Sequence, residues 1–239
     1  MRWYVVCALM LGVVVGFASF SFADKRSYVW TYEYQTMPQG MWELEYYVTG
    51  SIPRLADSGI NTIGQQVELE YGISNRWDVS LYQLYTIRNR RAETDSGYDG
   101  FKVRTRYRFA EKGRWLVDPL LYLEYKRDPH VSDPQDIEAK IVLAKDIGDF
   151  NVSYNQVFER ELERRGKTQL KYATGISYHL TSAVAVGIES KGSYSDPTAA
   201  LGPTLSWSGK TMWAAAGTAW GLGRGSDDMQ ARLIVGVLL

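Results

Sequence analysis

The chain has 239 residues, with 27 basic and 27 acidic side chains and therefore a formal net charge of zero. This length suits one domain of any class, or a single large β-domain. The even charge balance excludes a general nucleic-acid binder, which carries an excess of basic residues, so we expect no nucleic-acid partner.

The first segment has the pattern of a secretory signal peptide. Residues 1–23 read MRWYVVCALMLGVVVGFASFSFA, in which Arg2 precedes an apolar run and small residues precede the expected cleavage site after Ala23. The alternative is a membrane-anchoring helix, but the apolar run is shorter than the ~20 residues that a spanning helix needs. Cleavage removes Arg2 and Cys7, the only cysteine, which leaves 26 basic and 27 acidic side chains. The mature chain then has no disulfide, thiolate metal site or cysteine nucleophile.

From residue 41 to residue 239 the chain reads as one strand after another, each about ten residues long. The predicted strands are Met41–Gly50, Thr62–Ile73, Trp77–Arg88, Tyr98–Ala110, Arg114–Lys126, Asp136–Asp146, Asp149–Arg160, Lys167–Leu180, Ala183–Gly192, Ala199–Ser208, Thr211–Trp220 and Met229–Leu239. Short turns, such as Glu111–Gly113, alternate with longer polar loops, such as Asn89–Gly97. This pattern predicts an all-β fold, a transmembrane antiparallel up-and-down β-barrel of about 12 strands over residues 41–239, with the short turns in the periplasm.

The fourth predicted strand lies in the stretch GFKVRTRYRFAEKGRW, which alternates with unusual strictness. Its odd positions are apolar, aromatic or Thr, and its even positions are Lys102, Arg104, Arg106 and Arg108. A strand sends these two sets to opposite faces. A cation near the bilayer midplane costs about 2–4 kcal/mol, so the aromatic face is expected to meet lipid and the four cations to face the lumen.

Four carboxylates share this inward parity: Glu43 and Glu45 in the first predicted strand, and Glu68 and Glu70 in the second. The charges allow two interpretations. In one, they fill a narrow barrel with salt bridges and hydrogen bonds. In the other, cations and carboxylates face each other across water and form a selectivity lining.

Five tryptophans lie within a few residues of the short-turn ends of their strands: Trp42, Trp77, Trp115, Trp207 and Trp213. Indole prefers the membrane–water interface, so these residues are predicted to form one aromatic girdle. The alternative is that they cap the core of a soluble β-sandwich or a lipocalin-like barrel.

Residues 24–40 precede the first predicted strand and form an N-terminal segment. The sequence leaves its place open between a periplasmic arm, a thirteenth extended segment and a piece folded into the lumen.

The region from Thr36 to Tyr85 carries a turn with Gly, a strand with Glu-x-Glu, and the run ELEYGISNRWD that leads into the next strand. This pattern resembles a large group of Gram-negative outer-membrane barrels regarded as transporters, including the phenol meta-pathway type. The resemblance implies a β-barrel outer-membrane protein that takes up small, often hydrophobic or aromatic, compounds. It carries over no catalytic or ligand residues.

Catalytic interpretations rest on the two histidines. His130 and Ser132 form a His-x-Ser pattern that occurs in outer-membrane lipid hydrolases, but Pro129 and Pro134 bracket it and predict a loop. His179 has lumen parity, and a structural role is expected for it. We expect no catalytic residue, no metal site and no cofactor.

The sequence thus predicts a protein of the outer membrane of a Gram-negative bacterium, exported through a cleaved signal peptide. Its predicted role is a narrow channel for passive uptake of small polar or amphipathic solutes. The alternative is a closed structural or adhesive barrel with a salt-bridged interior, and an outer-membrane lipid hydrolase comes third. The expected partners are outer-membrane lipid and lipopolysaccharide, the barrel assembly machinery and a small-molecule solute.

Overall fold

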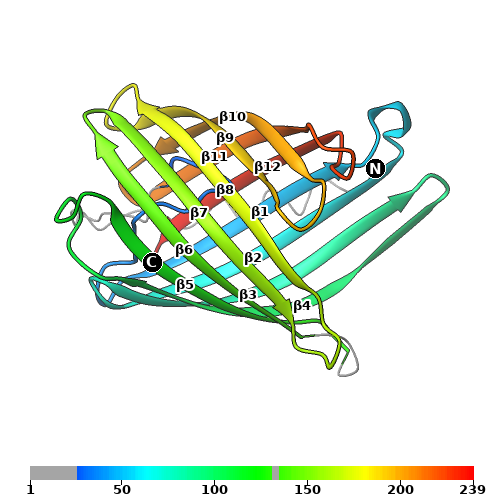
Figure 1. Ribbon diagram of the computed structural model, residues 1–239, viewed down its shortest axis with the longest axis horizontal. Helices are drawn as coiled ribbons and strands as arrows, with labels where there is room; N and C mark the ends of the chain where they lie inside the picture. The colour runs from blue at the N-terminus through cyan, green and yellow to red at the C-terminus, as the bar shows by residue number, and fades with distance from the viewer. Residues whose placement is uncertain (1–25, 131–134) are drawn as a thin grey trace.

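Twelve antiparallel strands close into one barrel (Figure 1). The computed structural model describes residues 26–130 and 135–239, so the predicted signal peptide and Ser132 lie outside the described residues. The strands are β1 (Trp42–Ile52), β2 (Ile60–Ser74), β3 (Trp77–Arg90), β4 (Glu93–Arg108), β5 (Asp118–Arg127), β6 (Gln135–Ile147), β7 (Phe150–Glu161), β8 (Thr168–His179), β9 (Val184–Ser193), β10 (Ala199–Ser208), β11 (Met212–Gly221) and β12 (Met229–Leu238). Each strand pairs with its neighbours in sequence, and β1 pairs with β12, which confirms the predicted all-β up-and-down barrel. Among the described residues, no helix has the length and apolarity to cross a membrane.

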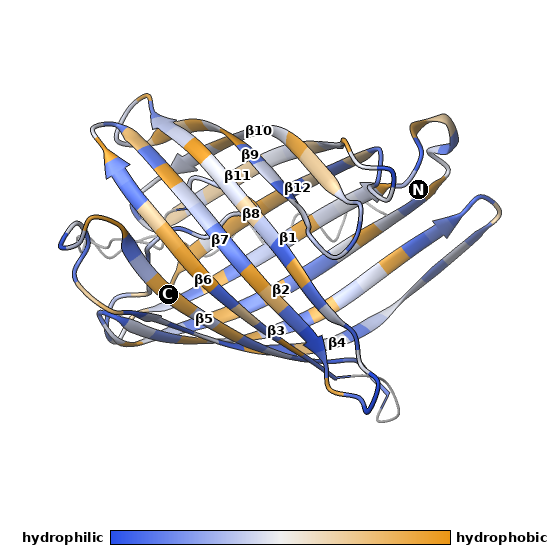
Figure 2. Ribbon diagram, viewed as in Figure 1, coloured by the Kyte–Doolittle hydropathy of each residue, from blue (hydrophilic) through white to orange (hydrophobic). Residues whose placement is uncertain are grey.

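Alternation of side chains gives the barrel an apolar outer surface and a polar interior. Apolar and polar residues alternate along many of the strands (Figure 2). On β4, Val103 and Tyr107 are 46% and 40% exposed, whereas Arg104 and Arg106 are 1% and 2% exposed. A soluble barrel has the reverse arrangement, so this side-chain pattern is that of a transmembrane barrel.

Two predicted connections are wrong. The predicted loop Asn89–Gly97 is largely strand, because β3 and β4 continue to a tight turn in which Arg91 has a φ of 55°. This hairpin extends beyond the rest of the barrel (Figure 1). A hydrogen-bonded ion pair at 2.6 Å between Arg91 and Asp57 anchors it and lowers the pKa of the Asp57 carboxyl. The predicted short turn Glu111–Gly113 belongs instead to a longer connection, because β4 ends at Arg108 and β5 begins at Asp118.

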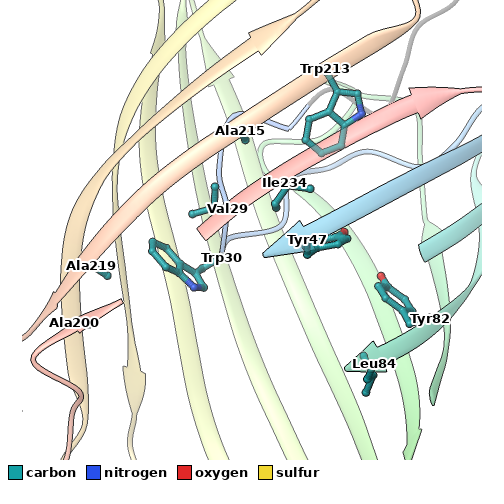
Figure 3. Packing of buried hydrophobic residues seen from close by; sticks show 10 residues of the cluster. All are labelled: Val29, Trp30, Tyr47, Tyr82, Leu84, Ala200, Trp213, Ala215, Ala219 and Ile234. Atoms are coloured by element: carbon teal, nitrogen blue, oxygen red, sulfur yellow. The ribbon is translucent and has the colours of Figure 1, made fainter. Parts of the chain in front are cut away.

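Residues 26–37 lie inside the barrel and form the luminal segment. Tyr28, Val29, Thr31 and Met37 of this segment are 0% exposed. Val29 and Trp30 belong to a buried cluster built from several strands (Figure 3). The other members of the cluster are Tyr47, Tyr82, Leu84, Ala200, Trp213, Ala215, Ala219 and Ile234.

Two glycines of the barrel wall make room for the luminal segment. A Cβ atom at Gly175 of β8 would lie 2.4 Å from the ring of Tyr28, and one at Gly217 of β11 would lie 2.7 Å from Cγ2 of Val29. Both separations are too short for carbon atoms, so a larger residue at either position would force the segment or the wall to shift.

Candidate functional site

The strand register places like charges next to one another in the lumen. Glu43 of β1 lies opposite Glu70 of β2, and Glu45 lies opposite Glu68. All four carboxylates are buried, with exposures of 0% or 1%. Like charges directly opposite each other destabilise a sheet, so these residues need nearby cations.

Arg104 and Arg106 of β4 supply much of that compensation. Arg104 contacts Glu68 at 2.9 Å and Glu70 at 2.6 Å. Arg106 contacts Glu70 and forms an ion pair with Asp78 of β3 at 2.8 Å. These charges touch directly and do not face each other across water, which is the arrangement of the salt-bridged interpretation. Removing one member of such a buried network costs about 3–5 kcal/mol, because its partners are left uncompensated.

Asp78 is a member of this buried network that the sequence did not single out. It is 0% exposed, and its carboxylate also accepts a hydrogen bond from the backbone N–H of Met37 at 3.0 Å. The alternation of side chains along the strand indicates its position, because Asp78 directly follows the outward-facing Trp77 and therefore faces the lumen.

The two remaining predicted cations lie on either side of this network along β4. Lys102 forms an ion pair with Glu124 of β5 at 3.1 Å, and its side chain is 21% exposed. Arg108 donates a hydrogen bond to the Thr36 hydroxyl at 2.9 Å, and so contacts the luminal segment. The structure therefore places all four predicted cations on the inner face of β4, but only Arg104 and Arg106 join the predicted glutamates.

The predicted girdle is wrong at one position. Trp213 is 0% exposed, and its indole N–H donates a hydrogen bond to Glu43 at 2.7 Å inside the lumen. Gly236 of β12 allows this, because a Cβ atom there would lie 2.2 Å from the indole nitrogen. The other four tryptophans are exposed by 42% to 47%, so the girdle stays a prediction for Trp42, Trp77, Trp115 and Trp207.

The carboxylate of Glu189, on β9, fixes the luminal segment. It accepts hydrogen bonds from the backbone N–H groups of Val29 at 2.7 Å, Trp30 at 2.9 Å and Thr31 at 2.8 Å. Consecutive backbone N–H groups that converge on one acceptor form an anion-binding nest. Glu189 is 1% exposed, so this nest satisfies a charge that would otherwise be buried without a partner.

Further hydrogen bonds tie the luminal segment to two other places in the barrel. Tyr32 and Asn155 of β7 form two hydrogen bonds with each other. The Tyr32 backbone N–H donates to the Asn155 amide oxygen at 2.7 Å, and the Asn155 amide nitrogen donates to the Tyr32 carbonyl at 2.9 Å. The Tyr34 hydroxyl donates to the Ala110 carbonyl at 2.5 Å and accepts from the Ala110 N–H at 3.0 Å. The segment is therefore held by the wall through polar contacts, as well as by the apolar packing of Val29.

Two separate cavities border the luminal segment. The larger, of about 410 Å³, is lined by Trp30 together with inward-facing residues of β6 to β10 and β12, including Lys140, Lys171 and Lys191. The smaller cavity, of about 160 Å³, is lined by Arg26 and Glu33 of the luminal segment and lies where a short turn joins β8 and β9. The segment therefore forms part of the wall of both cavities.

Within residues 26–130 and 135–239, one set of carboxylates has the geometry to hold a cation. Oxygen atoms of Glu45, Glu68 and Glu70 all lie within 4.8 Å of one another. Arg104 already contacts two of these residues, so a basic side chain compensates part of their charge.

No protein-family model and no curated protein matches the chain, whereas several solved structures do. The COG4313 outer membrane channel from Pseudomonas putida F1 matches with a TM-score of 0.67 at 9% identity, over 86% of this chain and 98% of that chain. The NanC porin matches with a TM-score of 0.55 at 14% identity, over 82% and 100% of the two chains. The KdgM porin matches with a TM-score of 0.55 at 11% identity, over 82% and 98%. At these identities the likeness shows a shared fold.

Proposed function

We propose that this protein is an outer-membrane channel for passive uptake of small polar or amphipathic solutes, and that the luminal segment restricts the path. The observation that carries the proposal is a polar lumen, inside an apolar outer surface, with a cavity on each side of a segment held only by non-covalent contacts. The proposal includes export through the predicted signal peptide and insertion by the barrel assembly machinery, with lipid and lipopolysaccharide around the barrel.

Two likenesses support this proposal. The matching solved structures include proteins described as a channel and as porins. The region from Thr36 to Tyr85 resembles barrels of the phenol meta-pathway type, which adds small aromatic compounds to the solutes to be tested.

We propose that ion selectivity rests on only part of the lining expected from sequence. Arg104 and Arg106 touch acidic partners and are almost fully buried, so they present little net charge to a solute. Partly exposed cations on the inner wall, such as Lys102 and Lys191, are better placed to act on a passing ion. We therefore assign Arg104 and Arg106 to holding the wall together and the partly exposed lysines to selectivity.

A closed structural or adhesive barrel is the second candidate. The buried network around Arg104 and the luminal segment favour it, because both occupy space that a solute needs. Nothing in the described residues favours the lipid hydrolase, and its Ser132 lies outside them.

Single-channel conductance of the refolded mature protein, in a planar bilayer under a salt gradient, separates these candidates. Discrete steps support a channel, and the sign of the reversal potential gives its preference for anions or cations. A silent bilayer, with a barrel whose folding is checked by heat-dependent gel mobility, would support the closed barrel and refute the channel.

A further inference from the structure

Two cations contact the ring of Trp30, and of these Lys191 is the one that lines the larger cavity. Among the described residues, the hydrogen bonds of both cations go to neutral groups. Lys191 of β9 and Arg232 of β12 both lie over the ring of Trp30, with Nζ 4.7 Å and Cζ 5.7 Å from its centroid. Lys191 contacts the side-chain amide oxygen of Gln230. Arg232 donates to one hydroxyl at 2.8 Å and to one backbone carbonyl at 3.0 Å.

The acidic residues around this cavity are engaged elsewhere. The pairs are Glu138 with Lys140 at 2.8 Å, Glu159 with Lys171 at 2.7 Å, Asp227 with the Gln230 amide at 2.7 Å, and Glu189 with the three backbone N–H groups of the luminal segment. A further acid, Asp196, lies exposed on the loop between β9 and β10. Lys191 is partly buried, and Glu189 and Asp227 act on it through space without forming an ion pair among the described residues, so its charge is only partly compensated.

Trp30 adds a second donor to the cavity lining. Its side chain is 8% exposed, and its indole N–H has no hydrogen-bond partner among the described residues. Buried polar groups in folded proteins nearly always have a partner, so an unused donor and a partly compensated lysine in one cavity lining point to an acceptor that binds there.

We propose that this cavity binds a small organic carboxylate at a site formed by Lys191 and Trp30, which we call the anion site. The carboxylate accepts a hydrogen bond from the Lys191 ammonium, a charge-assisted contact of the kind that binds carboxylates most strongly, and one from the Trp30 indole N–H. The volume of about 410 Å³ lies near the lower end of the range of about 300–1,000 Å³ for small-molecule sites.

The remaining lining indicates what the body of this molecule is like. Gln169, Ser193, Thr198 and Ser226 bring amide and hydroxyl groups to the cavity. Such groups suit a solute with several hydroxyls, so the class that fits is a compact hydroxylated monocarboxylate, such as a sugar acid. As a step in uptake this inference rests on the proposed channel function, but binding to the anion site does not require conduction.

Isothermal titration of the refolded protein in detergent tests the anion site, with sodium D-galacturonate as the probe and D-galactose as its uncharged counterpart. We expect saturable binding of galacturonate at least about tenfold tighter than that of galactose, because the two differ by the carboxylate. The variant Lys191→Met should weaken galacturonate binding by about tenfold or more, by loss of a charge-assisted hydrogen bond. The matched control is Lys210→Met, which removes an exposed lysine in the turn between β10 and β11 and should leave the affinity unchanged.

Equal binding of the two sugars, no saturable heat with galacturonate, or equal loss in both lysine variants would overturn the anion site. Thermal unfolding of the ligand-free protein gives a second readout. If Lys191 has no counterion, Lys191→Met removes an unfavourable buried charge and raises the midpoint temperature, whereas a lysine in an ion pair would lower it. A silent bilayer together with selective galacturonate binding would refute the channel and support the anion site. Conduction without selective binding would support the channel and refute the anion site.

Discussion

Replacing Arg106 by alanine tests whether the charges of the lumen are paired in a dry interior. Arg106 is 2% exposed and contacts both Asp78, at 2.8 Å, and Glu70. Breaking a buried ion pair costs about 3–5 kcal/mol, because the remaining charge stays buried. Arg104 still contacts Glu70 in the variant, so the loss falls mainly on Asp78 and should lie near the lower end, at about 3 kcal/mol.

The assay is urea unfolding of the refolded barrel, followed by tryptophan fluorescence. The matched control is Arg76→Ala, because Arg76 forms an exposed pair with Glu111 at 3.9 Å that should contribute about 0–1 kcal/mol. If Arg106→Ala destabilises the barrel no more than Arg76→Ala does, the charges of the lumen are screened by water. The salt-bridged interpretation would then be wrong, and Arg106 would return to the selectivity lining.

Three further predictions concern the luminal segment and the inner wall. Glu189→Gln should loosen the luminal segment, because one amide oxygen replaces a carboxylate that accepts three N–H groups. In a Ser27→Cys background, a maleimide should then label the cysteine faster in the Glu189→Gln variant than in the parent with Glu189. An unchanged labelling rate counts against the nest. Gly175→Leu should displace Tyr28 and destabilise the barrel by about 1–3 kcal/mol. Adding Tyr28→Ala to this variant should restore part of the lost stability, and the absence of any restoration would place the clash elsewhere. Trp213→Phe should lower the stability of the barrel equally in detergent and in lipid, because the Trp213 indole forms its hydrogen bond inside the lumen. A loss of stability found only in lipid would return Trp213 to the aromatic girdle.

The sequence predicts the barrel well where the two faces of a strand differ in polarity. On β4 the alternation of aromatic residues with Lys102, Arg104, Arg106 and Arg108 decides the inward face unambiguously, because only one orientation keeps the cations out of lipid. The same parity places the glutamates of β1 and β2 inside.

Where this contrast is absent, the prediction fails for an identifiable reason. Trp213 lies in the run MWAAAGTAWG, in which small residues occupy both faces, so the sequence gives no parity. Its inward position depends instead on the space left by Gly236 of the next strand, β12, and on a hydrogen bond to Glu43 of β1, which lies 170 positions away. The β3–β4 hairpin beyond Arg88 has water on both faces, so its strands carry polar residues throughout and resemble a loop.

The place of the luminal segment could not be predicted for a different reason. The segment has no regular strand partner, and its position follows from contacts with residues that are distant in sequence. Glu189 lies 160 positions from Val29, and Asn155 lies 123 positions from Tyr32. Neither residue differs, in sequence alone, from an ordinary polar residue of the inner wall.

The most direct test compares the single-channel conductance of a protein of residues 24–239 with that of a variant that also lacks residues 24–40. Both are measured in the same salt, and the folding of both is checked by heat-dependent gel mobility. We predict discrete steps in both proteins and a larger step in the deletion variant, because the luminal segment restricts the path. Equal steps in the two proteins would contradict this account and place the restriction in the barrel wall.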